Sequence, residues 1–193
     1  FNQDISGWNF TGLDYAYYFL NNASSFSTAN YDKLLTAINS QNLQLGVTFG
    51  DNSPVTYCYA EAARANLISS DFWSVSDAGQ SCPKISYDGN QNTSGTVPTD
   101  NTNGSVIADN SGNLARTGYT FAGWNTAADG SGTNYTANEV PYIYTDTTLY
   151  AKWTLNNYTL SFNSNGGSTV ADKTVAYNAT TTAPTAPTKT GYT

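Results

Sequence analysis

The sequence predicts an α+β protein that is mostly β-structure and is organised in tandem modules. The tripeptide Gly-Tyr-Thr at residue 118 recurs 73 residues later at residue 191, and a period of this size is typical of small repeated modules. Apolar residues at every second position of 43–49 indicate a strand with one buried face. Residues 34–38 follow a helical spacing instead, so we expect at least one helix beside the strands.

The remaining elements follow in order along the chain. Residues 60–68 are rich in alanine, which favours a helix by intrinsic propensity. Strands are expected where aromatic and β-branched residues gather or alternate, at residues 43–49, 72–75, 85–87, 119–121, 149–153, 158–162 and 174–177. Residues 163–167, Asn-Ser-Asn-Gly-Gly, predict a tight turn, and the two prolines within 181–189 favour an extended segment.

The composition argues against catalysis and against nucleic-acid binding. The chain has no His, so the commonest general base and metal ligand is missing. Glu61 and Glu139 lie far apart, and no motif pairs two carboxylates as glycosidases require. We therefore expect no catalytic residue. The 14 acidic and 7 basic residues give a net charge of −7, which disfavours nucleic acid and anionic membranes as partners.

No run of 18 apolar residues is present, so we expect no membrane insertion by this stretch. It begins with Phe-Asn-Gln-Asp rather than a leader, and the repeat at residue 191 is incomplete. We therefore expect an excerpt from a longer tandem array.

Cys58 and Cys82 are the two cysteines, and they flank the predicted helix at 60–68 and strand at 72–75. Without His and without a Cys-x-x-Cys motif, metal and redox sites are disfavoured. A disulfide is the favoured interpretation in an extracellular setting, and two buried thiols are the alternative. Closing a loop of about 25 residues would stabilise the fold by roughly 3–4 kcal/mol.

The N-terminal region carries a motif of its own. Phe1-Asn-Gln-Asp-Ile-Ser-Gly-Trp8 and the segment from Phe19 to Phe26 resemble the bacterial surface leucine-rich repeat family. The resemblance implies that residues 1–82 are the end of a leucine-rich solenoid with its cap, because such arrays close with an atypical unit.

A second motif runs from Gly118 to Tyr135 and closes at Leu149-Tyr-Ala-Lys-Trp153. It resembles the Listeria/Bacteroides repeat, the internalin B-type class of small β-grasp modules. The resemblance implies a complete module at residues 83–155 and the start of a second at residues 156–193. We expect its structural core to be Tyr119, Phe121, Trp124, Tyr135, Leu149 and Trp153.

Three loops are rich in oxygen ligands, at residues 100–104, 109–113 and 129–134. Calcium is one candidate occupant, but none of the loops has the spacing of an EF-hand. Asx turns, in which Asp or Asn accepts a bond from its own backbone, are the favoured interpretation. We expect no cofactor.

Seven Asn-x-Ser/Thr sequences are candidate glycosylation sites. They lie at Asn9, Asn22, Asn92, Asn103, Asn134, Asn157 and Asn178.

These features predict a non-catalytic extracellular protein of the cell surface, acting as an adhesin, a stalk or another structural repeat module. The expected partners are a surface protein or glycan of a host or neighbouring cell, or copies of the chain itself. Two alternatives stay open: the subunit of an extracellular filament assembled by strand donation, and accessory modules of a larger secreted enzyme.

Overall fold

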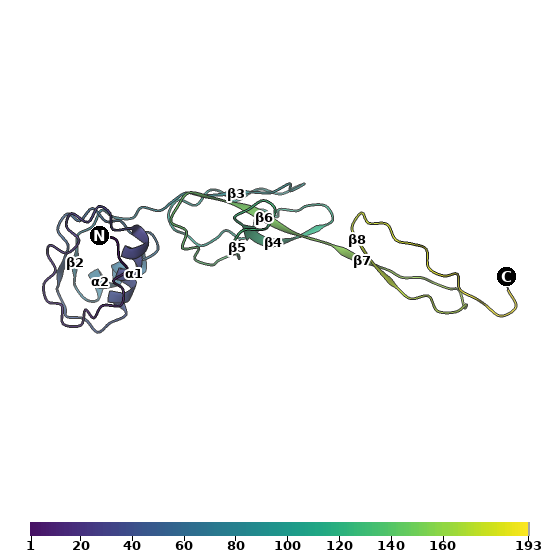
Figure 1. Ribbon diagram of the computed structural model, residues 1–193, viewed down its shortest axis with the longest axis horizontal. Helices are drawn as coiled ribbons and strands as arrows, with labels where there is room; N and C mark the ends of the chain where they lie inside the picture. The colour runs from purple at the N-terminus through teal and green to yellow at the C-terminus, as the bar shows by residue number, and fades with distance from the viewer. Residues whose placement is uncertain (193) are drawn as a thin grey trace. The chain divides into compact units, whose positions relative to one another are not determined.

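A computed structural model describes residues 1–192 and shows an α+β fold that is mostly β-structure (Figure 1). The elements in chain order are α1 (Thr28–Asn39), β1 (Thr48–Phe49), α2 (Glu61–Ser69), β2 (Ser74–Val75), β3 (Ile85–Asp88), β4 (Tyr119–Asn125), β5 (Asn134–Tyr135), β6 (Thr147–Leu155), β7 (Asn157–Leu160) and β8 (Lys173–Ala176). The predicted class, α+β and mostly β, and both predicted helices are confirmed.

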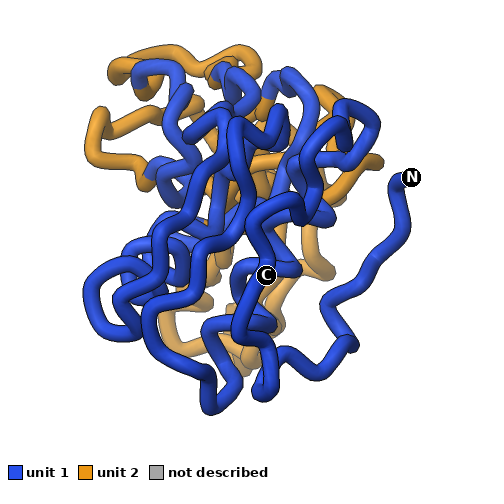
Figure 2. Tube along the Cα trace, turned by 90° about the vertical axis from the view of Figure 1, so that its left-hand side faces the viewer, with its two compact units in different colours: residues 1–86, 99–108, 137–148 blue, residues 87–98, 109–136, 149–193 orange. Residues whose placement is uncertain are grey.

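The chain divides into two compact units (Figure 2). The first unit consists of residues 1–86, 99–108 and 137–148, and the second of residues 87–98, 109–136 and 149–193. The division falls within β3 and β6, so each of these strands contributes to both units. The boundaries predicted at 82/83 and 155/156 stay predictions.

The core of the first unit is built around α1. Ser27 caps this helix by accepting a hydrogen bond from the Asn30 N–H. One face of α1 is buried, through Tyr31, Asp32, Leu34, Leu35 and Ile38. This face packs in a cluster that also includes Phe26, Phe49, Leu67 and Trp73.

The strand predicted over 43–49 is only partly correct. β1 covers Thr48–Phe49, and Gly46 has a φ of 72°. The chain therefore turns before it reaches the strand, and Leu45 is exposed where the alternating pattern predicted burial. Strand β2 is likewise shorter than predicted, because Phe72 has a positive φ and points to solvent while Trp73 is buried.

Pairing in this part of the chain is parallel and short. Ala16 bridges Phe49, β1 pairs with β2, and Tyr57 bridges Gln80. Phe49 therefore lies between Ala16 and Val75 in a ladder of three segments. Within the described residues this ladder does not extend into a leucine-rich solenoid.

The module at residues 83–155 contains a four-stranded sheet in the order β3-β6-β4-β5. β4 is antiparallel to both β5 and β6, and the sheet is open rather than closed. No helix lies in residues 83–155, all of which are described. The assignment of this module to the β-grasp class stays a prediction.

β7 and β8 form a separate antiparallel hairpin, with Tyr158 opposite Val175. The turn predicted at 163–167 is present, with positive φ at Asn165 and Gly166. All four residues of β7 are exposed, so the hairpin buries little apolar surface. Of the repeated Gly-Tyr-Thr at 191–193, Thr193 lies outside the described residues.

Candidate functional site

The residues predicted as the repeat core meet on one sheet. Trp124 and Leu149 are fully buried, and Tyr119, Phe121, Tyr135 and Trp153 are half-buried. The Trp124 ring lies 4.7 Å from the ring of Tyr87 and 5.4 Å from that of Phe121. Phe121 also contacts Trp153, its cross-strand neighbour, at 5.7 Å. The aromatic cluster therefore joins β3, β4 and β6.

A β-bulge aligns this cluster. Residues three apart point to opposite faces of a regular strand, yet the rings of Phe121 and Trp124 are in contact. The register between β4 and β6 shifts by one residue between them, which brings both rings to the same face. Gly123 occupies the bulge with a φ of 101°, and a Cβ there would lie 2.8 Å from the Tyr135 carbonyl oxygen.

Asn125 is a structural residue that the sequence did not reveal. Its side chain is 1% exposed and organises the loop between β4 and β5. The Oδ1 atom accepts from the N–H groups of Ala127 and Gly132, while the Nδ2 donates to Gly132 O and Asn134 Oδ1. A buried amide satisfied in this way fixes one loop conformation.

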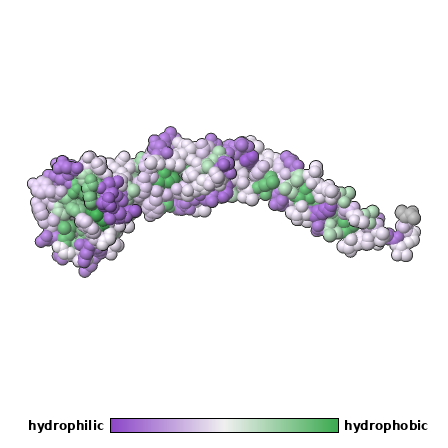
Figure 3. Space-filling model, viewed as in Figure 1, coloured by the Kyte–Doolittle hydropathy of each residue, from purple (hydrophilic) through white to green (hydrophobic). Residues whose placement is uncertain are grey.

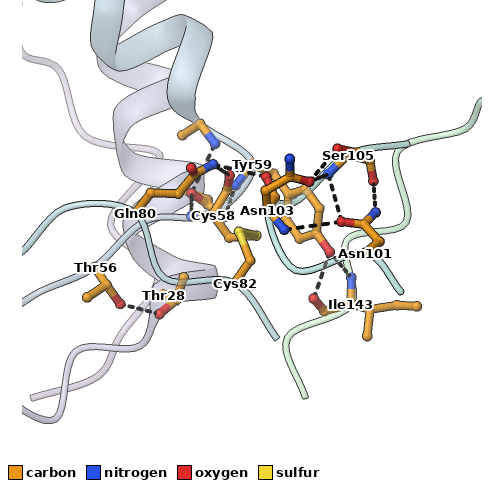
Figure 4. Close-up of a disulfide and its surroundings, with 12 residues drawn as sticks. Thr28, Thr56, Cys58, Tyr59, Gln80, Cys82, Asn101, Asn103, Ser105 and Ile143 are labelled. Carbon is orange, nitrogen blue, oxygen red and sulfur yellow. Dashed lines mark hydrogen bonds between the residues drawn. A yellow bond between two sulfur atoms is a disulfide. The ribbon is translucent and has the colours of Figure 1, made fainter. Parts of the chain in front are cut away.

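The disulfide between Cys58 and Cys82 is present in the first unit (Figure 4). Gln80 Nε2 donates to the carbonyl oxygens of Cys58 and Asn103, so it bridges the disulfide to the loop at 101–105. Gly104 lies against the bridge, since a Cβ there would be 2.9 Å and 3.0 Å from the two sulfur atoms. The residue at position 104 therefore has to be small.

Asp32 is the second residue that sequence reasoning missed. It is 4% exposed, and its carboxylate accepts the N–H groups of Cys58, Tyr59 and Ala60 just before α2. Three such bonds stabilise a buried carboxylate at the start of a helix. The helical spacing of residues 31–38 marks Asp32 as a position on α1, but no local signal links it to residues 58–60.

Tyr59, which donates its backbone N–H to Asp32, also lines a groove on the first unit. The Tyr59 hydroxyl donates to the Ile143 carbonyl oxygen at 2.8 Å and accepts from the Ile143 N–H at 3.2 Å (Figure 4). The rings of Tyr142 and Tyr144 each lie 5.4 Å from the ring of Tyr59. Burial, together with the nearby Asp32 carboxylate, raises the pKa of Tyr144 well above its ordinary value.

We refer to this feature as the tyrosine groove. It has a volume of about 460 Å³ and is lined by Ser6, Asp32, Lys33, Thr36, Ala37, Ser40, Tyr59, Tyr142 and Tyr144. No local pattern in the sequence indicates it, because Tyr142 and Tyr144 lie about 100 residues from α1 along the chain.

The oxygen-rich loops adopt Asx turns. Asn101, Asp109 and Asp129 each accept the N–H of the residue two positions ahead through a side-chain oxygen. In residues 1–192 no three His, Cys, Asp or Glu side chains come together as a metal site would require. Calcium binding is untested and stays a prediction.

Six of the seven candidate glycosylation sites are exposed, and Asn92 is half-buried. Asn103 and Asn134 also make hydrogen bonds within their loops through their side chains. Glycosylation at these sites stays a prediction.

The module at residues 83–155 matches a known protein family. The Listeria-Bacteroides repeat domain matches residues 84–152 and again residues 158–193, which together make up more than half of the chain. The chain belongs to this family. The first repeat therefore holds Tyr87, Phe121 and Trp124 of the aromatic cluster, with Trp153 directly after it, and the second begins with the hairpin β7-β8.

Relatives contain similar repeats within much longer chains. A protein of Evansella cellulosilytica named as a Gly-rich membrane protein is 34% identical over 76% of this chain and 17% of its own length. Internalin H of Listeria monocytogenes is 42% identical over 39% of this chain and 13% of its own length. The chain thus spans less than a fifth of either relative. No solved structure matches it.

Each of the two Listeria-Bacteroides repeats has a residue in close contact with a segment that comes earlier in the chain. Gly104 lies on the disulfide, and the Tyr177 ring lies on Gly118, where any Cβ would collide with it. The Tyr177 N–H donates to Asn156 O, and the Asn156 N–H donates to Gly118 O. The second repeat is therefore connected to the first through Tyr177, Asn156 and Gly118.

Proposed function

We propose that this chain is a non-catalytic part of a cell-surface protein, in which the tandem repeats serve as spacer modules of a stalk. The observation that carries the proposal is the contact formed by Tyr177, Asn156 and Gly118 between the second repeat and the first. A spacer needs a defined connection between successive modules, and a ring seated on a glycine with two backbone hydrogen bonds supplies one. Modules that contact mainly their neighbours are typical of repeat arrays.

We further propose that residues 1–82 are the closing end of a leucine-rich array. The parallel ladder of Ala16, Phe49 and Val75 supports this origin, because leucine-rich units stack through short parallel strands. The helix α2 and the disulfide beside it would then form the cap.

An extracellular position on the cell surface fits the same features. A disulfide persists in oxidising surroundings, and the relatives include a named membrane protein and an internalin. No helix in residues 1–192 is long and apolar enough to cross a membrane.

The partner would be a surface protein or glycan, or another copy of the chain. Large hydrophobic side chains are exposed in the N-terminal part, among them Phe1, Trp8, Tyr15 and Tyr18. Figure 3 shows hydrophobic residues gathered on the visible face of this part. Exposed apolar surface of this kind supports an adhesive role.

The spacer proposal can be tested by surface display. The full chain, tagged at its N-terminus, would be anchored to a bacterial surface through its C-terminal end, and antibody access to the tag would be measured. The matched control replaces residues 84–192 by a Gly/Ser linker of equal length, which behaves as a compact random coil. We expect the repeats to keep the tag more accessible than the linker, and equal accessibility would contradict a spacer role.

The proposal that the chain is non-catalytic can be tested separately. Hydrolysis of a glycan or peptide that a single carboxylate substitution abolishes would contradict the non-catalytic assignment. The alternative in which these are accessory modules of a larger secreted enzyme stays a prediction.

A second candidate function is a filament subunit. Tyr158 and Leu160 of β7 are 53% and 44% exposed, and β7-β8 is a two-stranded sheet. Exposed apolar strands of this kind can accept a strand from another molecule.

A further inference from the structure

The tyrosine groove has two chemically different walls. One wall is a single face of α1 and its C-cap, where Lys33, Thr36 and Ser40 follow each other at helical spacing. The other wall is formed by the rings of Tyr59, Tyr142 and Tyr144. Its volume of about 460 Å³ is within the range of small-ligand sites, about 300–1,000 Å³.

The aromatic wall is assembled before any ligand arrives. Both backbone groups of Ile143 are bonded to the Tyr59 hydroxyl, which holds the segment 142–144 against Tyr59. Tyr59 is in turn held by its N–H bond to buried Asp32. Because the hydroxyl of Tyr59 is occupied, this residue offers the groove its ring face.

Tyr142 has a conformation that packing does not explain. Its φ is +46°, which is unfavourable for a bulky side chain, and its side chain is 65% exposed. An aromatic side chain this exposed buries little apolar surface, so its packing does little to offset the unfavourable backbone conformation. Backbone strain of this kind concentrates at ligand-binding positions.

The helical wall accepts hydrogen bonds more readily than it donates them. The Thr36 hydroxyl donates its proton to Asp32 O, and the Ser40 hydroxyl donates to Ala37 O. Both oxygens therefore keep lone pairs for an incoming donor. Lys33 supplies a cation, which is already paired with Asp4.

We propose that the tyrosine groove binds a neutral oligosaccharide. The apolar C–H face of a sugar ring packs on tyrosine, and the hydroxyl groups at its edge donate to Thr36 and Ser40. A proline-rich peptide also fits tyrosine-lined grooves, but proline has no N–H to donate to the acceptor wall. The net charge of −7 disfavours acidic glycans.

The test is an NMR titration of the ¹⁵N-labelled full chain with chitotetraose and with cellotetraose. We expect shift changes confined to the groove residues, with a Kd of about 0.1–1 mM for at least one of the two sugars. No change in the groove with either sugar at about 10 mM would overturn the proposal. Changes caused by a proline-rich decapeptide, and by neither sugar, would overturn it in favour of a peptide ligand.

Three substitutions test whether the ring of Tyr142 binds the sugar. Tyr142→Ala should weaken binding at least tenfold, while Tyr142→Phe should keep it because the ring is retained. Tyr158→Ala removes another exposed tyrosine, which lies outside the groove, and should leave binding unchanged. Equal affinity of Tyr142→Ala and the unsubstituted chain would overturn the proposal. Saccharide binding depends on the groove residues and the spacer role on the contact of Tyr177 with Gly118, so each can fail without the other.

Discussion

Trp124 is the side chain on which the first repeat most depends. It is fully buried and contacts both Tyr87 and Phe121, whereas Trp153 is half-buried and bonds through its indole N–H to the carbonyls of Gly89 and Asn90. We expect Trp124→Ala to lower the free energy of unfolding by about 3–5 kcal/mol. Trp153→Ala should cost less, about 1–3 kcal/mol. Denaturant unfolding followed by NMR of the β4 and β6 amides measures both, and a loss below about 1 kcal/mol for Trp124→Ala would contradict its role in the core.

Asp4 provides a pH-dependent prediction. The Ser6 hydroxyl, then the Lys33 ammonium and the Ser6 N–H, lower the pKa of Asp4 to about 2. A lowered pKa means that the ionised form is favoured in the fold, so this contribution to stability is present above about pH 4 and is lost as the pH falls toward about 2.

Ser6→Ala should raise the pKa of Asp4 toward its ordinary value, because the largest cause of the shift is removed. The chemical shift of the Asp4 carboxyl carbon as a function of pH measures this directly. The matched variant is Ser25→Ala, which removes an exposed hydroxyl elsewhere in the N-terminal part. An unchanged Asp4 titration in Ser6→Ala would contradict the assignment.

At the scale of elements, the disulfide holds the segment that contains α2 and β2. Replacing both Cys58 and Cys82 by Ala should lower the free energy of unfolding by about 2–4 kcal/mol, since the bridge closes a loop with a sequence separation of 24 residues. Amide exchange should accelerate first in α2, while the amides of β4 and β6 keep their protection. Two thiols that can be alkylated in the native, unreduced protein would show that the bridge does not form.

The hairpin β7-β8 should depend on Tyr177. A two-stranded sheet is marginal alone, and Tyr177 anchors this one to Gly118. We expect Tyr177→Ala to destabilise the hairpin by about 1–2 kcal/mol and to speed amide exchange in both strands.

Tyr158→Ala is the control for this prediction, because Tyr158 lies in the same hairpin but is exposed. Equal acceleration of exchange in the two variants would show that the contact with Gly118 contributes nothing specific.

At the scale of the whole molecule, strand addition predicts concentration-dependent association. Light scattering should compare the full chain with a version that ends at residue 154 and lacks the exposed strands. If the filament hypothesis holds, the full chain should grow in mass with concentration while the shorter version stays monomeric. Strictly monomeric behaviour of both, with slow exchange in β7, would contradict it.

Local patterns in the sequence determined much of this protein. The helical spacing of 34–38 predicted α1, the alanine-rich segment predicted α2, and the Gly-Tyr-Thr repeat predicted the tandem Listeria-Bacteroides modules. These signals are local because a helix, a strand or a repeat records its periodicity within a few residues. The absence of His and of a Cys-x-x-Cys motif likewise favoured a disulfide over a metal or redox site, and the Cys58–Cys82 bridge is present.

The tertiary structure decided the contacts between distant residues. Asp32 accepts hydrogen bonds from the backbone of residues 58–60, and the Tyr59 hydroxyl is hydrogen-bonded to Ile143, 84 positions later in the sequence. The bulge at Gly123 places Phe121 and Trp124 on one face, although strand periodicity alone predicts opposite faces. The tyrosine groove follows from the same cause, because its walls exist only after the chain has brought α1 and residues 142–144 together.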